Sequence, residues 1–257
     1  MLDLVNTGSW LIRKIYRSRP RVRLFCFHYA GGGASIFQSW SHKLPSDIEV
    51  YAVQLPGRET RFGERPFTSL LPLVDKLCRV IYPYINIPYV FFGHSMGALV
   101  SFELAQTICK RYGKSPEHLF VSGRLAPHLQ SSKPQIHQLP PAEFLEEIRL
   151  LNGTPDSILN NKELMELIIP ILRADFAVCE TYQYQPSEPL TCPITVIGGN
   201  LDESVDFRRL QSWQQHTTNH CSLHMLDGDH FFVNTCQSEL LKIIVKCHEA
   251  DLKYQNT

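Results

Sequence analysis

The sequence lacks the features that would indicate a membrane protein, a nucleic-acid-binding protein or a metal-binding protein. It has no run of about 18 apolar residues, so we expect no transmembrane helix, and its N-terminus has no apolar segment typical of a signal peptide. Its 25 Lys and Arg residues balance 25 Asp and Glu residues, so no net positive charge attracts nucleic acid or an anionic membrane. No CxxC pair occurs among the eight cysteines, which gives a zinc or thioredoxin-like site little support.

The cysteines and the overall composition indicate an ordinary globular protein. Several cysteines lie inside apolar runs such as LFCF and LCRVI, as buried free thiols do in a reducing compartment. Hydrophobic residues make up 44% of the chain and charged residues 19%. We therefore expect a cytoplasmic monomer with neither a nucleic-acid nor a membrane partner.

A cluster of positive charge lies near the N-terminus. Residues 13–23 hold six cations, which are Arg13, Lys14, Arg17, Arg19, Arg21 and Arg23. A solvated, partly extended arm is one interpretation of such a charge run. A docking patch for an acidic partner is the other.

Strand-like and helix-like segments alternate along most of the chain, and this pattern predicts the fold class. Apolar, strand-like runs are expected near residues 23–27, 48–55, 88–95, 118–125, 193–202 and 221–230. Helical spacing is expected between and after them, at 35–44, 69–85, 96–113, 207–217 and 236–250. We predict a single α/β domain over 1–257 with a mostly parallel sheet and helices on both faces. Residues 125–189 contain two further helical patterns and no strand, so they form a helical insertion.

The segment Gly93-His94-Ser95-Met96-Gly97 is the strongest candidate for chemistry. It matches GxSxG, and the strand-like VFF precedes it while the helical ALVSFELA follows it. A nucleophile on a sharp strand-to-helix turn has a strained backbone, and side chains beside it would clash with neighbouring elements. The glycines therefore predict that Ser95 is held out to react. His94 should point away from the reacting face, as a structural residue.

A base and an orienting acid follow in the chain order Ser, acid, His of α/β-hydrolases. His230 follows a strand-like run, in the loop LDGDH, and is the expected general base. Asp202 follows the strand ITVIGG and should lie at the carboxyl edge of the sheet, where it would accept a hydrogen bond from the imidazole Nδ1. The rival acids are Glu203, Asp206, Asp227 and Asp229.

The expected oxyanion hole consists of two backbone N–H groups. One belongs to Met96, the residue after the nucleophile. The other lies in the glycine-rich loop HYAGGG, where we favour the amide of Ala30 and keep Gly31 as the alternative. The same loop is not a dinucleotide site, because GxGxxG does not fit with isoleucine at position 36.

Seven segments together resemble one family, the type II thioesterases of nonribosomal peptide and polyketide synthesis. They are FCFHYAGGGAS, VQLPGRETRFGERPF, FFGHSMGALVSFELA, VSGRLAP, LRADFAVCETY, CPITVIGGNLD and DGDHFF, and they cover about residues 20–245 in the family's order. One departure is His28, where the family more often has proline.

The resemblance implies an α/β-hydrolase fold in which residues 125–189 form a lid. It also implies hydrolysis of acyl thioesters on the phosphopantetheine arm of acyl or peptidyl carrier proteins, which clears stalled or mis-primed groups from a synthase. No metal and no bound cofactor is expected. A small-molecule esterase or lipase and a noncatalytic carrier-binding module are the alternatives. Arg58, Arg61 and Arg65 would contact a phosphate or an acidic carrier protein, or else form surface charge or structural ion pairs.

Overall fold

The computed structural model describes residues 10–129 and 134–255, and one mixed sheet forms the centre of this part of the chain. Its strands pair in the order β1-β3-β2-β4-β5-β6-β7. Strands β2 to β7 run parallel, and β1 pairs antiparallel with β3 at the edge. The strands are β1 (Leu11–Ile12), β2 (Val22–Phe27), β3 (Ile48–Val53), β4 (Tyr89–His94), β5 (His118–Ser122), β6 (Ile194–Gly199) and β7 (Cys221–Leu226).

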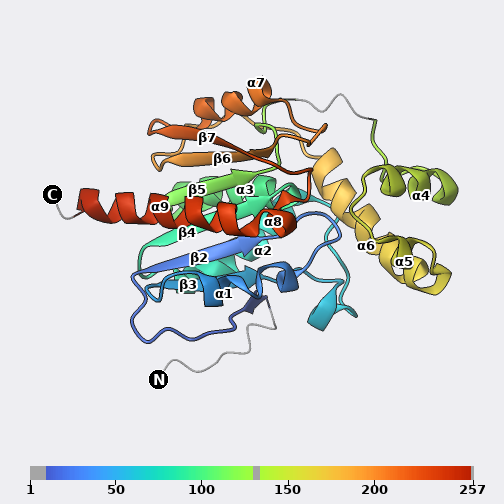
Figure 1. The fold of residues 1–257 in the computed structure, drawn as a ribbon, viewed down its shortest axis with the longest axis horizontal. Coiled ribbons are helices and arrows are strands. Elements are labelled where there is room, and N and C mark those ends of the chain that lie inside the picture. Colours follow the sequence, from blue (N-terminus) through green and yellow to red (C-terminus); the bar gives the residue numbers. More distant parts are fainter. Residues whose placement is uncertain (1–9, 130–133, 256–257) are drawn as a thin grey trace.

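Helices cover both faces of the sheet (Figure 1). The helices in the described part of the chain are α1 (Trp40–Lys43), α2 (Leu70–Ile81), α3 (Met96–Tyr112), α4 (Pro141–Leu150), α5 (Asp156–Leu159), α6 (Lys162–Glu180), α7 (Phe207–Leu210), α8 (Phe232–Thr235) and α9 (Gln237–Gln255). Helices α2 and α3 bury apolar residues in one core cluster, and α1, α8 and α9 contribute to the other. The predicted α/β class, with helices on both faces, is confirmed.

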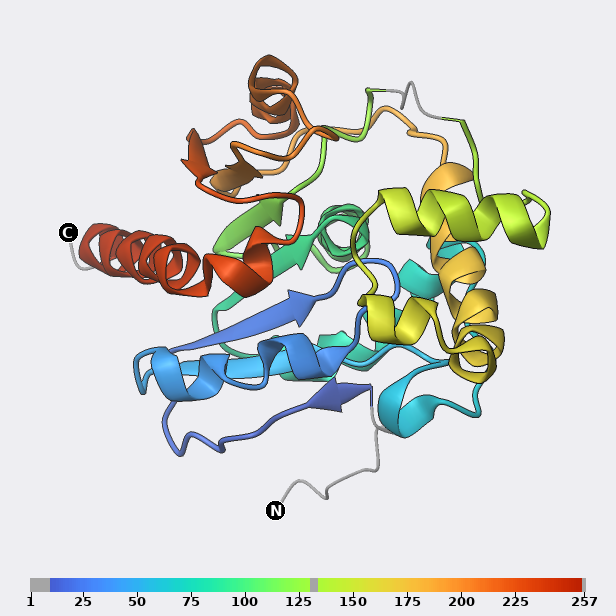
Figure 2. The same cartoon turned by 45° about the vertical axis from the view of Figure 1, so that its right-hand side comes forward.

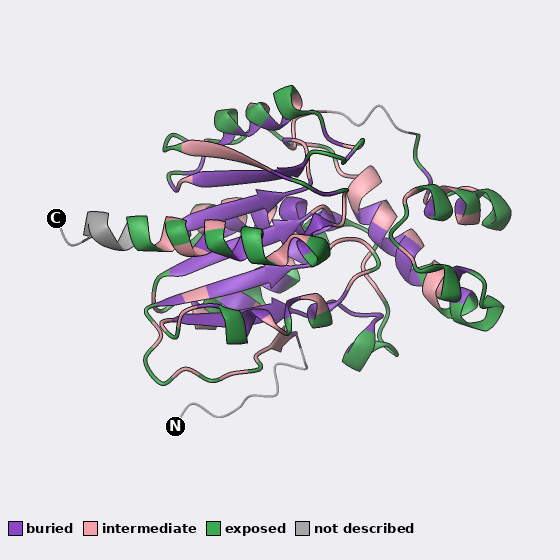
Figure 3. Cartoon of the chain, in the orientation of Figure 1, coloured by how far each residue is buried: buried purple, intermediate pink, exposed green. Residues whose placement is uncertain are grey.

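Strand β4 shows why the central strands are continuously apolar. Its residues are all buried (Figure 3). Successive side chains of a strand point to opposite faces, so Phe91 enters the α2–α3 core whereas Phe92 packs on Trp40 of α1, with ring centroids 4.9 Å apart. A strand that is covered on both faces has no polar alternation, which is the pattern of VFF in the sequence.

The predicted helical insertion forms α4, α5 and α6, which lie beyond the carboxyl ends of the parallel strands (Figures 1 and 2). These helices share a third apolar cluster that includes Phe144, Ile148, Leu159, Met165 and Leu172. The insertion therefore has a small core of its own at the edge of the sheet where the predicted site residues lie.

The structure differs from the sequence predictions in several local features. Strand β1 was not predicted, because a two-residue strand has no readable periodicity. The helix expected at 207–217 is the short α7 followed by a 3-10 segment at Gln211–His216. The helix expected at 35–44 is a 3-10 segment at Ala34–Phe37 followed by the short α1. None of the eight cysteines, which all lie in the described residues, forms a disulfide, as predicted. In the described part of the chain no helix is both long and apolar enough to cross a membrane.

The basic segment near the N-terminus is only in part a solvated arm. Arg13 and Arg23 both form ion pairs with the buried carboxylate of Glu49 at the start of β3. Glu49 also accepts hydrogen bonds from the hydroxyl of Tyr51 and the N–H of Arg17. Glu49 thus attaches this segment to the sheet, and the interpretation of a solvated arm is wrong for Arg13, Arg17 and Arg23.

We expect Glu49→Gln to lower the free energy of unfolding by about 1–3 kcal/mol, because it replaces a buried ionised acceptor with an amide that faces two guanidinium groups. Urea unfolding measures the change. Glu166→Gln on the exposed side of α6 is the control, with an expected effect within about 0.5 kcal/mol. Equal stability of the two variants would show that Glu49 does not anchor the segment.

Candidate active site

Ser95 occupies a strained turn between β4 and α3. Its φ is 53° and its ψ is −111°, values that a non-glycine residue rarely adopts. Its N–H donates to the carbonyl of Ser122 at the end of β5, over 2.8 Å. The turn therefore directs the Ser95 side chain away from the strand, at the carboxyl edge of the sheet.

The two glycines of the motif permit close approaches of the backbone. A Cβ atom on Gly93 would lie 2.1 Å from the carbonyl oxygen of Gly97. A Cβ atom on Gly97 would lie 2.1 Å from the carbonyl oxygen of Phe27 in β2. Neither position has room for a side chain. The predicted reason for the glycines agrees with this geometry.

The structure brings Ser95, His230 and Asp202 together. The Nε2 atom of His230 lies 3.0 Å from the Ser95 hydroxyl oxygen. The Nδ1 atom lies 2.6 Å from Oδ2 of Asp202. The three residues follow β4, β7 and β6, and the carboxyl ends of these parallel strands meet at one edge of the sheet. The rival acids do not make this contact.

The environment of Asp202 favours its carboxylate form. Burial raises the pKa of Asp202, but hydrogen bonds from His230 and Ser204 outweigh it, so that the pKa lies below its ordinary value. A carboxylate only accepts, so Nδ1 of His230 carries the proton and Nε2 is free to accept from the Ser95 hydroxyl. This tautomer is the one that a general base requires.

Ser204 is a site residue that the sequence reasoning missed. Its N–H donates to Oδ1 of Asp202 over 2.9 Å, and its hydroxyl contacts the same oxygen. The hydroxyl oxygen also lies 3.2 Å from Nδ1 of His230. Ser204 therefore fixes the orientation of the carboxylate against the imidazole. A lone serine two residues after an acid gives no signal that would have identified it in the sequence.

His94 is buried and points away from the Ser95 hydroxyl, as a structural residue would. Its Nε2 lies 2.8 Å from the carbonyl oxygen of His230, which only accepts, so Nε2 carries the proton. Its Nδ1 lies 2.8 Å from the hydroxyl of Ser122. Burial, together with the nearby His230, lowers the pKa of His94 to about 3. The neutral ring thus holds the backbone of His230 in place.

The two expected oxyanion donors come from the start of α3 and from the loop after β2. Met96 is the first residue of α3, so its N–H has no carbonyl partner four residues earlier in the helix. In the loop after β2, the N–H of Gly31 donates to Asp175 over 2.7 Å. That contact engages the alternative donor and leaves Ala30 as the candidate.

Two of the three arginines considered for phosphate or carrier contacts are structural. Arg58 and Arg61 are buried, and they pair with Asp175 and Glu64. Arg65 is exposed. Of these three arginines, only Arg65 can still be interpreted either as a surface charge or as a contact for a partner.

A mostly parallel sheet with a serine on a strand-to-helix turn, backed by an imidazole and a carboxylate, defines an α/β-hydrolase. The thioesterase domain family model matches residues 22–250. The chain belongs to this family.

Known proteins of this family resemble the chain over nearly its full length. The gramicidin S biosynthesis protein GrsT of Aneurinibacillus migulanus is 46% identical and aligns over 96% of each chain. A protein named linear gramicidin dehydrogenase LgrE, of Brevibacillus parabrevis, is 47% identical over 93% of this chain and 92% of its own. The structure of BorB, a type II thioesterase from the borrelidin biosynthetic cluster, has a TM-score of 0.85, 33% identity, and coverage of 93% of this chain and 97% of its own.

The buried, neutral His94 predicts a dependence of stability on pH. Its pKa is about 3 in the folded protein and 6.5 ordinarily, so between these values the unfolded chain binds a proton that the folded chain does not. The free energy of unfolding therefore falls as the pH decreases below 6.5, by about 1.4 kcal/mol per pH unit for this group. His94→Gln should reduce the slope of stability against pH by that amount.

Urea unfolding at a series of pH values between 6.5 and 4.5 measures this slope. His220→Gln, at an exposed position, is the matched control and should keep the wild-type slope. A His94→Gln protein with the wild-type slope would contradict the assignment of a neutral, buried imidazole.

Proposed function

We propose that the protein is a serine thioesterase that hydrolyses acyl groups from the phosphopantetheine arm of acyl or peptidyl carrier proteins. The observation that carries the proposal is the continuous contact of Ser95, His230 and Asp202 in a chain of the thioesterase family. The proposed role is editing, which removes stalled or mis-primed acyl groups from a nonribosomal peptide or polyketide synthase.

The first half of the reaction forms an acyl-enzyme. The Ser95 oxygen attacks the thioester carbonyl carbon while Nε2 of His230 takes the hydroxyl proton. Asp202 accepts from Nδ1 and stabilises the imidazolium that results. The carbon–sulfur bond then breaks, and His230 returns the proton to the departing pantetheine sulfur. The acyl group is left as an ester of Ser95.

The second half frees the acid. Water loses a proton to Nε2 of His230 and attacks the ester carbonyl, and the bond to the Ser95 oxygen breaks as His230 returns the proton to that oxygen. In both halves the tetrahedral oxygen would accept from the N–H groups of Met96 and Ala30. The proposed steps use only groups of this chain, and phosphopantetheine enters as part of the substrate.

The substrate class is supported by the relatives and by the position of the insertion. GrsT is named for gramicidin S biosynthesis, and BorB is a type II thioesterase from the borrelidin cluster. In the described structure, α4 to α6 lie over the edge of the sheet that carries Ser95 (Figure 2). We propose that this insertion is a lid over the acyl chain, and that carrier domains are the partners of a monomeric enzyme.

LgrE is named a dehydrogenase, but we do not propose a redox function for this chain. A dinucleotide site of the common type needs GxGxxG, and the glycine loop after β2 does not have that spacing. The loop instead leads into the 3-10 segment Ala34–Phe37.

We expect the wild-type protein to hydrolyse an acetyl- or short-acyl-loaded carrier protein faster than the same acyl-coenzyme A or p-nitrophenyl acetate. Ser95→Ala should lower every Ser95-dependent rate by at least about 10³-fold, since it removes the nucleophile. Release of free thiol and of nitrophenolate measures the rates.

The pattern of rates separates the alternatives. Preference for p-nitrophenyl acetate would favour a general esterase and contradict the carrier-bound substrate. No turnover of any substrate, together with no labelling of Ser95 by a fluorophosphonate, would favour a noncatalytic carrier-binding module.

A further inference from the structure

The candidate oxyanion donor Ala30 lies in a tight turn, and each peptide group of this turn has its own hydrogen-bond partner. The N–H of Gly32 donates to the carbonyl of Tyr29 over 3.0 Å, which closes a turn with Ala30 and Gly31 at its centre. Gly31 has a φ of +78°, the value that a type II turn requires at its third position. The direction of the Ala30 N–H therefore depends on the orientation of these few peptide groups.

The peptide group before Ala30 is fixed through its oxygen. The carbonyl oxygen of Tyr29 lies 2.8 Å from Nδ1 of His28, which donates to it. This bond adds to the one from Gly32. Because a trans peptide group is planar, fixing the Tyr29 oxygen also fixes the opposite direction of the Ala30 N–H.

The peptide group after Ala30 is fixed through its N–H, which belongs to Gly31. That N–H donates to Oδ2 of Asp175 over 2.7 Å, although the two residues lie 144 positions apart. Type I and type II turns differ by a reversal of this central peptide group. The carboxylate of Asp175 therefore selects the type II form, in which the N–H of Gly31 points at α6.

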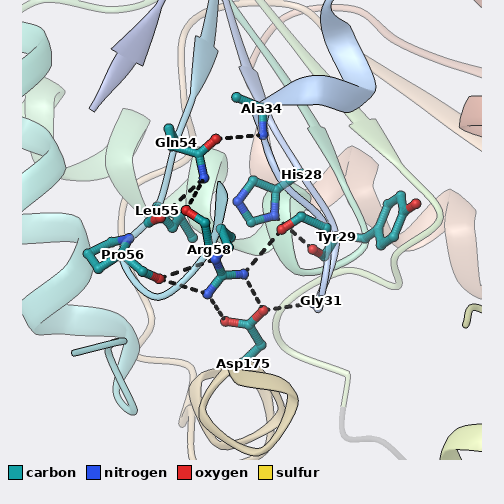
Figure 4. A network of polar contacts seen from close by, with 10 residues as sticks. His28, Tyr29, Gly31, Ala34, Gln54, Leu55, Pro56, Arg58 and Asp175 are labelled. Carbon is teal, nitrogen blue, oxygen red and sulfur yellow. Dashed lines mark hydrogen bonds and ion pairs between the residues drawn. The ribbon is translucent and has the colours of Figure 1, made fainter. Parts of the chain in front are cut away.

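Asp175 is itself held rigidly (Figure 4). Arg58 donates to both of its oxygens, over 2.6 and 2.9 Å, and both side chains are buried. Arg58 also donates to the carbonyls of Gly32 and Pro56. One guanidinium group thus joins helix α6, the glycine loop and the loop after β3.

Helix α6 contacts the turn a second time. Leu172 lies one turn before Asp175, on the same face of the helix. Its Cδ2 atom occupies the place next to Gly31, 2.6 Å from where a Cβ atom would be. The turn that carries Ala30 is therefore packed against α6 by both an apolar and a charged contact.

We propose that Asp175 and Arg58 are positioning residues for the oxyanion hole. They hold the peptide group after Ala30, which shares the Ala30 Cα atom with the peptide group that carries the Ala30 N–H, so the placing of that N–H depends on the seating of α6. This inference rests on the proposed function, because it assigns the second oxyanion donor of the same site. The insertion then does more than cover the substrate, because one of its helices holds the loop that stabilises the tetrahedral oxygen.

A buried ion pair suits this task better than an apolar contact. Taking two charges out of water offsets much of their attraction, so such a pair contributes little net stability. It does specify one geometry, because the planar guanidinium group matches the carboxylate at two points. An apolar pair at the same place would leave the N–H of Gly31 without an acceptor.

The test compares Asp175→Asn and Arg58→Lys with the wild-type protein, by kcat and KM and by the rate at which a fluorophosphonate labels Ser95. The phosphonyl oxygen enters the oxyanion hole, so labelling reports on the hole without a thioester substrate. For Asp175→Asn we expect kcat and the labelling rate to fall together by about 10- to 100-fold, less than the loss of a whole donor, with KM changed less than about 3-fold. For Arg58→Lys we expect a kcat and a labelling rate between those of Asp175→Asn and those of the wild-type protein.

Glu180→Gln is the matched control on α6. Its carboxylate accepts from the main-chain N–H groups of Ile136 and His137 and does not touch the glycine loop. It should weaken the insertion yet label at the wild-type rate, with urea unfolding confirming that each variant is folded at assay temperature. If Asp175→Asn does not fold, Arg58→Lys decides the question.

A folded Asp175→Asn or Arg58→Lys protein that labels and turns over at wild-type rates would overturn the inference. So would an equal loss in Glu180→Gln, because the effect would then be one of general stability. If the wild-type protein labels at Ser95 but hydrolyses no thioester, the proposed function fails while the labelling comparison still tests the positioning role.

Discussion

The close approach of three backbone segments at Gly93, Gly97 and Phe27 is the constraint on which the rest of the site depends. A Cβ atom at Gly93 or at Gly97 would collide with a carbonyl oxygen, of Gly97 or of Phe27 respectively. The backbone of β4 therefore passes into α3 through a sharp turn. Ser95 makes this sharp turn possible by adopting a φ of 53°. The core packs against both faces of β4, and this packing holds Ser95 in its strained conformation. The orientation of the Ser95 hydroxyl is thus a consequence of packing.

The other site groups reach Ser95 because the sheet is parallel around it. Loops after β6 and β7 end at the same edge as β4, and they supply Asp202 and His230. Ser204 donates a hydrogen bond to the Asp202 carboxylate, and the neutral ring of His94 donates one to the backbone carbonyl of His230. The loop after β2 is held by Asp175 of the insertion. The site is therefore assembled from the turn after β4, the loops after β2, β6 and β7, and α6, and each of these is held by at least one hydrogen bond.

The sequence predicted the parts of this arrangement that depend on local pattern. Apolar runs and helical spacing gave the α/β class, and GHSMG with its flanking segments identified the turn at Ser95. Asp202 and His230 were predicted from their places after strands. Ser204 could not be, because a serine two residues after an acid carries no signal of its own. The Arg58–Asp175 pair could not be either, because it joins residues 117 positions apart and a charged residue in a helical pattern is normally solvated. Strand β1 was too short to show any period.

The most direct test of the central claim is to look for the acyl group on Ser95. The protein is mixed with an acyl-loaded carrier protein, quenched in acid at early times, and digested for mass spectrometry. We predict that the peptide containing Ser95 carries the acyl group transiently, and that the Ser95→Ala protein never does. Release of free acid with no acyl group on Ser95 at any time would contradict the account.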